Sequence, residues 1–488
     1  MTMLHLAVQE QVGEEQVAQD QIAQEETAAS GSSRAGSQPR PAAPRPHTER
    51  MGLFATIRAL RTNPITAFPA EAYQVPILEV GRLRKLVLVN DPDEIEHVLV
   101  GNAGNYRKSM QQQRRLRPAL GDGLLTAEGA AWQGARRIAA PLFNPGAVAQ
   151  LSDDMLEAAA VMRDRWLDRF SPARPMDLSA EFQRLTYEIV SRTVFSGALD
   201  QDRARVHANM AIYFDTFGRI DLASLFNLPA WVPTQAALRA RPALAVFRSI
   251  VDRIVAQRVA DPEREASDLL DRLMRSPVPA TGKVMTPVAV ADNVLTFLAA
   301  GHETTGNALA WILYLLALFP ETEAAVAEEL VSVVGERPSG LDAFDKLVFT
   351  RAVVNEALRL YPPAPFMGRE ALGRDDLARR RIEKGTQVLI SPWIVHRHRR
   401  LWDDPEDFRP ERFMPPKDRD IPRGAFIPFG LGPRVCIGRS FAVQEILVVL
   451  ATILPMFHFR LLDAQSVSPE ARITLRPAGG MPMIVTPR

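Results

Sequence analysis

Residues 429–438 read Phe-Gly-Leu-Gly-Pro-Arg-Val-Cys-Ile-Gly and lead directly into an apolar stretch with helical character. Cys436, the only cysteine of the chain, lies just before that predicted helix. Backbone N–H groups and the positive end of a helix dipole favour a thiolate there. The glycines let the backbone turn tightly and approach a flat ligand, and Arg434 can meet an anion. A lone cysteine is more often a small buried hydrophobe, but the positions around Cys436 indicate a metal-bound thiolate.

This stretch resembles the haem-binding signature of the cytochrome P450 superfamily. The matching residues are Phe429, Gly430, Gly432, Arg434, Cys436 and Gly438. The resemblance implies that Cys436 is the proximal ligand of the iron of haem b, and that Phe429, Arg434 and Gly438 also belong to the cofactor site. Because a thiolate pushes electron density onto iron and favours O–O cleavage, it implies an oxygen-activating enzyme rather than an oxygen carrier.

Length and charge are compatible with one large domain. The 58 Lys and Arg residues nearly balance the 57 Asp and Glu residues, and the net charge of +1 argues against a nucleic acid partner. A single cysteine permits no intramolecular disulfide and no multi-cysteine metal site, which suits a reducing compartment and predicts a cytoplasmic protein. No linker-like segment follows residue 50, so we expect residues 51–488 to form a single P450 haem domain.

The first fifty residues differ in kind. They are rich in Gln, Glu and Ala and then in Ser, Gly, Pro and Arg, with little to bury, so we expect residues 1–50 to form a disordered N-terminal tail. No basic start followed by a long apolar run is present, which predicts neither a signal peptide nor a membrane anchor.

Helices dominate the predicted secondary structure. The expected helices begin after Asp91 and end near Leu99, run over 177–195 and 235–260, and extend from Thr286 to about Phe319. Two strands are expected over 73–80 and 85–89. The predicted fold class is therefore mainly α with small β-sheets, which is also what the resemblance implies: the P450 fold.

The long helix from Thr286 carries a second motif. Residues 300–305, Ala-Gly-His-Glu-Thr-Thr, match the oxygen-activation motif of the family, with Glu303 and Thr304 at the catalytic acid and alcohol positions. Small residues such as Gly301 would let the helix pass close over the haem, and Thr304 could bond back to a carbonyl and open a gap for O2 and water. Carboxylate, hydroxyl and water would relay the protons that oxygen cleavage consumes. We expect His302 to be structural or solvent-facing.

Charged residues elsewhere match the family's other conserved roles. Glu356 and Arg359 stand three apart on one predicted helix and would form a buried structural clamp with Arg412. The haem propionates are expected to meet Trp132 and Arg136, one turn apart, and Arg369 and Arg434 on the other side. These four residues are predicted cofactor contacts. His396 and His398 are interpreted as surface or packing residues.

The substrate is less well defined. The stretches expected to line the distal pocket are 109–126, 210–233, 294–304, 364–367 and 479–483. They are rich in Ile, Leu, Phe and Met, so an apolar substrate fits, whether a fatty acid, alkane, terpenoid or steroid.

The expected function is O2-dependent hydroxylation or epoxidation of such a substrate. No G-x-G-x-x-G fingerprint and no room for a flavin domain are present, so electrons from NAD(P)H would arrive through a reductase and a ferredoxin or flavodoxin. A peroxide-driven or isomerising relative and a haem-based sensor or carrier are the alternatives.

Overall fold

The computed structural model describes residues 39–49, 51–80, 86–168, 174–218, 235–261, 268–278, 281–335 and 343–488. The chain divides into two units, Met1–Arg40 and Pro41–Arg488, and the second contains every element named below. The expected tail lies, from residue 1 to 38, outside the described residues.

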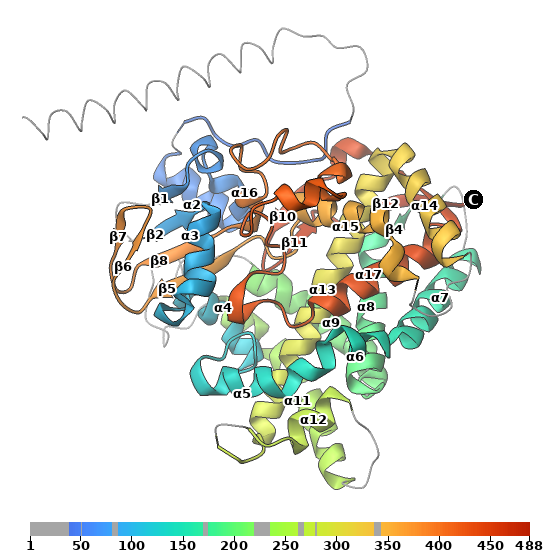
Figure 1. The fold of residues 1–488 in the computed structure, drawn as a ribbon. Helices are drawn as coiled ribbons and strands as arrows, with labels where there is room; N and C mark the ends of the chain where they lie inside the picture. The colour runs from blue at the N-terminus through green and yellow to red at the C-terminus, as the bar shows by residue number, and fades with distance from the viewer. Residues whose placement is uncertain are drawn as a thin grey trace, which may run out of the picture. The chain divides into compact units, whose positions relative to one another are not determined.

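The described part of the second unit is mainly helical, as predicted (Figure 1). Its helices are α2 Leu53–Thr62, α3 Pro92–Glu96, α4 Met110–Leu120, α5 Gly129–Ala139, α6 Pro145–Ala149, α7 Ser152–Asp168, α8 Leu178–Phe195, α9 Arg203–Gly218, α11 Gln235–Ala260, α12 Leu269–Arg275, α13 Pro287–Leu318, α14 Pro320–Val334, α15 Val348–Leu360, α16 Pro392–Val395 and α17 Arg439–Ile453. Single turns such as η3 His97–Gly101 connect some of them.

The strands are short and form four small sheets. They are β1 Ile77–Glu79, β2 Leu86–Val89, β3 Tyr106–Lys108, β4 Met176–Asp177, β5 Met367–Ala371, β6 Asp375–Leu377, β7 Arg380–Ile382, β8 Gln387–Ile390, β9 Phe457–Leu461, β10 Pro469–Ala471, β11 Leu475–Pro477 and β12 Pro482–Pro487. The largest sheet has the order β1-β2-β8-β5-β3, in which β2 and β8 are parallel and the other pairs antiparallel. Strands β10 and β11 form a separate hairpin.

Capping residues fix several helix starts where the sequence predicts them. The Asp91 side chain accepts hydrogen bonds from the backbone N–H groups of Asp93 and Glu94, and Asp177 accepts one from Ser179. Thr286 accepts one from the N–H of Ala289 at the start of α13. Each cap satisfies helix N–H groups that have no intrahelical partner, so local chemistry determines these boundaries.

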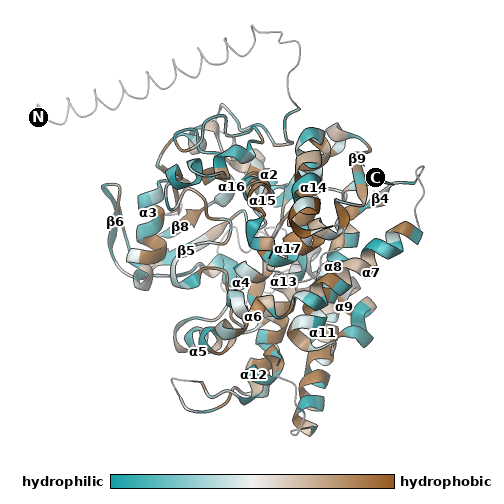
Figure 2. Cartoon of the chain, turned by 45° about the vertical axis from the view of Figure 1, so that its right-hand side comes forward, coloured by the Kyte–Doolittle hydropathy of each residue, from teal (hydrophilic) through white to brown (hydrophobic). Residues whose placement is uncertain are grey.

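Helix α13 is the centre of the hydrophobic core. It packs against α8, α11, α15 and α17, and its residues are buried from Val290 to Leu298 and again from Thr305 to Leu316. Trp311 stacks on Tyr361 at a centroid distance of 4.0 Å. Figure 2 shows hydrophobic and hydrophilic residues side by side on most helices, as expected when one face of each helix turns to this core.

Part of the segment that precedes residue 51 contacts this core. The backbone N–H of Ala42 donates to the Tyr314 hydroxyl at 3.0 Å, and the Tyr361 hydroxyl donates to the Ala42 carbonyl at 2.9 Å. The division of the chain into a tail and a domain at residue 50 stays a prediction.

Within the described residues, no single helix is long and apolar enough to cross a membrane. Helices α13 and α14 reach the required length and hydropathy only when they are counted together, and their axes differ by 116°.

Candidate active site

The loop before α17 presents Cys436. The backbone N–H of Cys436 donates to the carbonyl of Phe429 at 2.9 Å, and that of Val435 donates to Gly432 at 3.0 Å, so the loop closes on itself. Gly432 has a φ of +71°, and a Cβ there would lie 2.0 Å from the carbonyl oxygen of Leu99 in η3. Only glycine fits this position, because the backbone is left-handed and another backbone approaches it closely.

Cys436 is accessible to solvent, although many protein atoms surround its thiol. This burial raises its pKa above the usual value, although the N–H of Gly438 and the charges of Arg136 and Arg439 lower it. The sequence predicts surroundings that favour the thiolate; the structure contains those groups, but desolvation outweighs them. A coordinated metal ion deprotonates a thiol outright, so iron binding would supply what the protein alone does not.

Beside the loop, positive charge is concentrated in a small buried volume. Lys108 of β3 and Arg369 of β5 are direct cross-strand neighbours, and Arg434 acts electrostatically on both. Burial and these like charges lower the pKa of Lys108 to about 7 and that of Arg369 to about 10, while only Glu128 opposes them. Like charges directly opposite in a sheet are destabilising. The cluster therefore fits a ligand that brings negative charge, as the two propionates of haem do.

Trp132 and Arg136 of α5 complete this cluster. The guanidinium carbon of Arg434 lies 3.8 Å from the centroid of the Trp132 ring, and Arg434 also pairs with Glu128. The Nη1 atom of Arg136 donates to the carbonyl of Val435 at 2.8 Å, which ties α5 to the residue before Cys436. The structure thus brings the four predicted propionate residues to one place.

Lys108 is a candidate cofactor residue that the sequence reasoning missed. From the sequence, Lys108 could equally engage a carboxylate or belong to a solvated charged face, and neither reading placed it at the haem. The residue is 7% exposed, and its side chain donates to the carbonyls of Leu124 and Ala127. The sequence signal that could have revealed this is the alternation of side chains along a strand. It places Tyr106 and Lys108 on the inner face of β3 and Arg107 on the outer face, where it pairs with Glu370.

The oxygen-activation motif lies where α13 becomes accessible. Ala300 is exposed, and Gly301 and Thr304 are half-buried, between two fully buried stretches of the helix. The Thr304 hydroxyl donates to the carbonyl of Ala300 at 2.6 Å, as predicted. The predicted gap in the helix is absent, because α13 is helical from Pro287 to Leu318 and the carbonyl of Ala300 can accept this bond without a break.

Gly301 has a packing role in this structure. A Cβ at this position would lie 2.9 Å from Cγ2 of Val190, so the missing side chain lets α8 approach α13. His302 is 3% exposed and its ring meets Tyr187 edge to face at 6.0 Å, which makes it structural rather than solvent-facing.

Glu303 and Thr304 point in different directions. Glu303 is 3% exposed, and its buried Oε2 atom has no hydrogen-bond partner among the described residues. Burial raises the pKa of its carboxyl to about 7, whereas the nearby hydroxyl of Thr474, in the turn between β10 and β11, and the charge of Arg476 lower it. The acid and the alcohol of the predicted relay are therefore one residue apart in sequence but do not meet in this structure.

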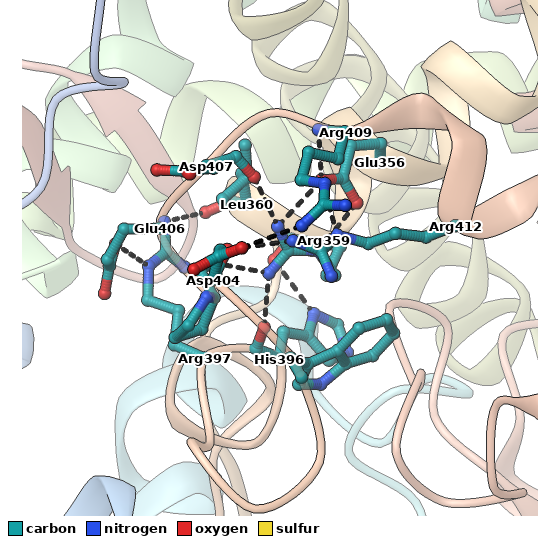
Figure 3. Close-up of polar contacts among 12 residues, drawn as sticks. Glu356, Arg359, Leu360, His396, Arg397, Asp404, Glu406, Asp407, Arg409 and Arg412 are labelled. Carbon is teal, nitrogen blue, oxygen red and sulfur yellow. Dashed lines mark hydrogen bonds and ion pairs between the residues drawn. The ribbon is translucent and has the colours of Figure 1, made fainter. Parts of the chain in front are cut away.

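Glu356, Arg359 and Arg412 form a buried charge network (Figure 3). Glu356 and Arg359 are both fully buried and pair through two hydrogen bonds of 2.6 and 2.8 Å. The Nε atom of Arg412 lies 3.4 Å from Oε1 of Glu356, and the backbone N–H of Arg409 donates to the same oxygen at 2.8 Å. Two guanidiniums thus share one carboxylate, as predicted.

The network extends from this clamp to the loop that leads to Cys436. Arg359 donates to the carbonyls of His396, Pro405 and Asp407 at 2.7, 2.7 and 3.0 Å. The Nε2 atom of His396 accepts the backbone N–H of Ile427 at 2.9 Å, so its Nδ1–H donates to the carbonyl of Arg359. Burial lowers the pKa of His396 to about 3, which keeps the ring neutral. His396 and His398 are buried packing residues rather than surface residues.

A small apolar cavity of about 20 Å³, partly open to solvent, lies between α4, α11 and α13. Its lining residues are Ala119, Leu120, Leu244, Phe247, Leu295, Leu298 and Ala299. Two of the stretches that the sequence predicts as pocket, 109–126 and 294–304, contribute to it, while the α11 residues were not predicted. Residues 219–233 of the predicted lining lie outside the described residues. Phe297, also predicted, stacks on Phe143 at 5.5 Å and is 8% exposed, as a core residue.

Comparisons with known proteins identify the family of this chain. A sequence model described as Cytochrome P450 matches residues 41–481. Cyclooctatin synthase from Streptomyces melanosporofaciens is 32% identical over 408 residues, which cover 83% of this chain and 87% of that protein. Cyclooctat-9-en-7-ol 5-monooxygenase from the same organism is 32% identical over 377 residues, covering 77% and 80% respectively.

A solved structure shows the same fold. The crystal structure of a cytochrome P450 named CYP102L1 superposes with a TM-score of 0.78 at 27% identity, and the match covers 93% of this chain and all of that one. Fold and site together define a haem-binding protein with a cysteine thiolate ligand. The chain belongs to the cytochrome P450 family and is a monooxygenase.

The family's haem is held by a cysteine thiolate, and Cys436 is the only cysteine that this chain can offer. When bound, haem supplies the oxygen activation that protein side chains cannot perform. The cationic cluster around Lys108, Arg369 and Arg434 fits its propionates in charge.

Proposed function

We propose that this monooxygenase hydroxylates or epoxidises an apolar organic substrate of the fatty acid, alkane, terpenoid or steroid class. The observation that carries the proposal is the cavity between α4, α11 and α13, because all seven of its lining residues are apolar. Binding of a hydrocarbon in such a cavity is favourable because apolar surface leaves water. A charged group would find no polar partner there. A relative that acts, by its name, on cyclooctat-9-en-7-ol supports a mainly hydrocarbon substrate.

The cavity also adjoins the accessible part of α13. Ala299 lines it and directly precedes Ala300, which accepts the hydrogen bond of Thr304. A substrate in this cavity would therefore lie next to the oxygen-activation motif. We assign proton delivery to Glu303 and Thr304, haem contacts to Trp132, Arg136, Gly301, Arg369, Phe429, Arg434, Cys436 and Gly438, and a structural role to Glu356, Arg359 and Arg412.

We further propose that electrons from NAD(P)H reach the cytoplasmic enzyme through a separate ferredoxin or flavodoxin and its reductase. Arg137 and Arg439 support this, because both are exposed and both lie beside residues of the Cys436 site. An acidic electron carrier would be attracted to such a surface.

The experiment is a ligand screen on the haem-loaded protein that follows the Soret band. Apolar compounds should shift the band, and charged analogues of equal size should not. Leu244→Trp should abolish the shift for larger ligands because it fills the cavity, whereas Leu238→Trp, on the exposed side of the same helix, should not. Equal responses of the two variants would refute the assignment of the cavity, and turnover with peroxide but not with O2 and a reducing partner would favour a peroxide-driven enzyme.

A further inference from the structure

Lys108 of β3 holds its amine between two carbonyl groups in the interior of the protein. The residue is 7% exposed, and its Nζ atom donates to the carbonyl of Leu124 at 3.1 Å and to that of Ala127 at 3.0 Å. Among the residues that the structure describes, no other group accepts a hydrogen bond from this amine. A neutral amine has two N–H groups and matches these two acceptors, whereas an ammonium has a third N–H for which they leave no partner.

Two arginines place positive charge beside this amine. The carbonyl of Ala127 also accepts a hydrogen bond from Nη1 of Arg434, and both nitrogens lie 3.0 Å from its oxygen. Arg369 of β5 is the direct cross-strand neighbour of Lys108. A proton on the Lys108 amine would therefore add a third positive charge to a buried place that already contains two, and burial and like charges both disfavour the charged form.

Glu128 is the acid that acts on this amine, and its carboxylate is already engaged by other groups. Its Oε1 atom accepts the backbone N–H of Lys108 at 3.0 Å, and its Oε2 atom pairs with Arg434. Arg107, next to Lys108 on β3, turns to the opposite face of the sheet. The charges that act on the amine are those of Arg434, Glu128 and Arg369, and together with burial they place the pKa of Lys108 at about 7. A stable ammonium at this position therefore needs a further anion.

We propose that the cofactor site binds haem together with one proton from solvent, and that Lys108 takes up this proton. The resulting ammonium keeps its bonds to both carbonyls, and a propionate would supply the acceptor for its third N–H and the anion for its charge. The inference rests on the haem contacts proposed for Arg369 and Arg434. It goes beyond them because it makes retention of the cofactor depend on pH through one residue.

The direction of the pH effect follows from linkage. A propionate raises the pKa of Lys108 above the value of about 7 that the protein groups alone impose. Below this value Lys108 carries its proton with or without haem, so its full contribution to haem affinity is present. Above it the proton is bound only together with haem, and the affinity falls until the pH reaches the raised pKa. The Cys436 thiol acts in the opposite direction, because binding of iron releases its proton. Only a comparison of variants therefore isolates Lys108.

Partition of haem between the loaded protein and excess apomyoglobin at equilibrium tests the linkage. The share that the protein retains, read from the reduced carbonyl spectrum at several pH values, gives its relative affinity for haem. Compared with Lys108→Met, which cannot titrate, the unmodified protein should lose affinity from about pH 7 upward, by about tenfold per unit at most. Lys384→Met removes an exposed lysine and is the matched control, which should follow the unmodified protein. Lys108→Gln serves if Lys108→Met does not load haem, because an amide N–H can still donate to the carbonyls.

Carbon-13 NMR of the diamagnetic ferrous carbonyl protein, labelled at lysine Cε, reports the charge of the amine itself. The chain has six lysines, and four of them, Lys283, Lys346, Lys384 and Lys417, are exposed. The signal that is absent from the Lys108 variant belongs to Lys108. It should show an ammonium at about pH 8, where the protein groups alone would leave most of the amine neutral.

A neutral Lys108 amine at about pH 8 in the loaded protein, or a Lys108→Met variant whose haem affinity follows that of the unmodified protein at every pH, would overturn the proposal. Arg434→Gln separates this failure from a failure of the proposed haem contacts. If Arg434→Gln lowers retention at every pH while Lys108→Met has no effect on the pH dependence, the contacts hold and the proton linkage fails. If Arg434→Gln retains haem fully while Lys108→Met alters the pH dependence as described, the linkage holds and the contact assigned to Arg434 fails.

Discussion

The Thr304 hydroxyl donates its hydrogen to the carbonyl of Ala300, one turn earlier in α13. Its lone pairs remain available on the side where the helix is accessible, so the oxygen can accept a hydrogen bond from water or a neighbouring acid. Under the proposed function, a residue placed this way would order protons at the site without contributing to haem or substrate binding. Loss of the hydroxyl should therefore slow or misdirect the chemical step and leave substrate affinity unchanged.

In Thr304→Ala, haem content and the substrate-induced Soret shift should stay close to those of the unmodified protein. NAD(P)H consumption should continue while product per electron pair falls and hydrogen peroxide accumulates, because protons are no longer delivered in order. Parallel measurement of NAD(P)H, product and peroxide checks this. Thr296→Ala is the control, since Thr296 makes the same bond to a carbonyl four residues earlier, at 2.9 Å to Asp292, but is buried. Full coupling in Thr304→Ala across several substrates would contradict the assignment.

At the scale of elements, the Glu356 network joins α15 to the loop before Cys436. Replacing Glu356 by Gln keeps its shape but leaves the charge of Arg359 buried without a counter-ion, which should cost about 3–5 kcal/mol. We expect a large loss of haem per protein chain and a lower melting temperature, measured by haem assay and circular dichroism.

Glu406→Gln is the control for this substitution, because Glu406 pairs with Arg397 in the same network but is 41% exposed. Its haem content should be nearly unchanged. Equal haem loss in the two variants would contradict the view that burial of the Glu356 charge pair, rather than the network in general, supports cofactor binding.

His396 makes the free energy of unfolding depend on pH. Its ring is neutral in the folded protein because burial lowers its pKa from 6.5 to about 3, whereas the unfolded chain would bind a proton below pH 6.5. Its contribution to stability is therefore fully present above pH 6.5 and is lost as the pH falls, by about 1.4 kcal/mol per unit.

His396→Gln should remove this part of the pH dependence. A glutamine can still accept the N–H of Ile427 but does not titrate, so the variant should be less stable at neutral pH and lose less stability between pH 6.5 and 5. Urea unfolding of the haem-loaded protein at several pH values checks the slope. A slope identical to that of the unmodified protein would assign the acid lability to other groups.

The elements differ in how far they could be predicted. Caps at Asp91, Asp177 and Thr286 are local, so the sequence locates α3, α8 and α13 within a few residues. The surroundings of Lys108 and Glu303 depend on elements far apart in the chain, β3 beside β5 and the β10–β11 hairpin beside α13, and neither period nor spacing reveals such neighbours. The desolvation of Cys436 likewise depends on many residues that are distant in the sequence, so the sequence does not reveal its effect on the pKa of the thiol. The motif residues could therefore be named in advance, but not the direction of the Glu303 side chain.

At the scale of the whole domain, Arg137 and Arg439 provide positive charge near Cys436. Arg423, which precedes the Cys436 loop in the sequence, is paired with Glu96 at 2.7 Å and should contribute less. Arg137→Glu or Arg439→Glu should slow the first electron transfer from an acidic carrier and leave substrate affinity unchanged. The difference should shrink as salt rises, because the Debye length is only about 10 Å at 0.1 M. Stopped-flow reduction under carbon monoxide at several ionic strengths measures both effects.

Arg241→Glu, an exposed residue of α11, is the control for net charge. If it slows reduction as much as the other two variants, total charge rather than a docking surface governs the rate. If none of the three variants responds at any ionic strength, electrostatic docking of the carrier is refuted.

The cavity between α4, α11 and α13 shares no residue with the Glu356 network, the cationic cluster or the loop of Cys436. Mutations that reshape it should therefore leave the proposed cofactor contacts in place, and aliphatic exchanges of similar volume in such walls usually cost little stability. A few substitutions in this cavity, each with little effect on stability, can thus change which hydrocarbon the enzyme prefers. The same separation makes Leu244, Leu295 and Leu298 suitable positions for a combinatorial library in which most variants keep their haem.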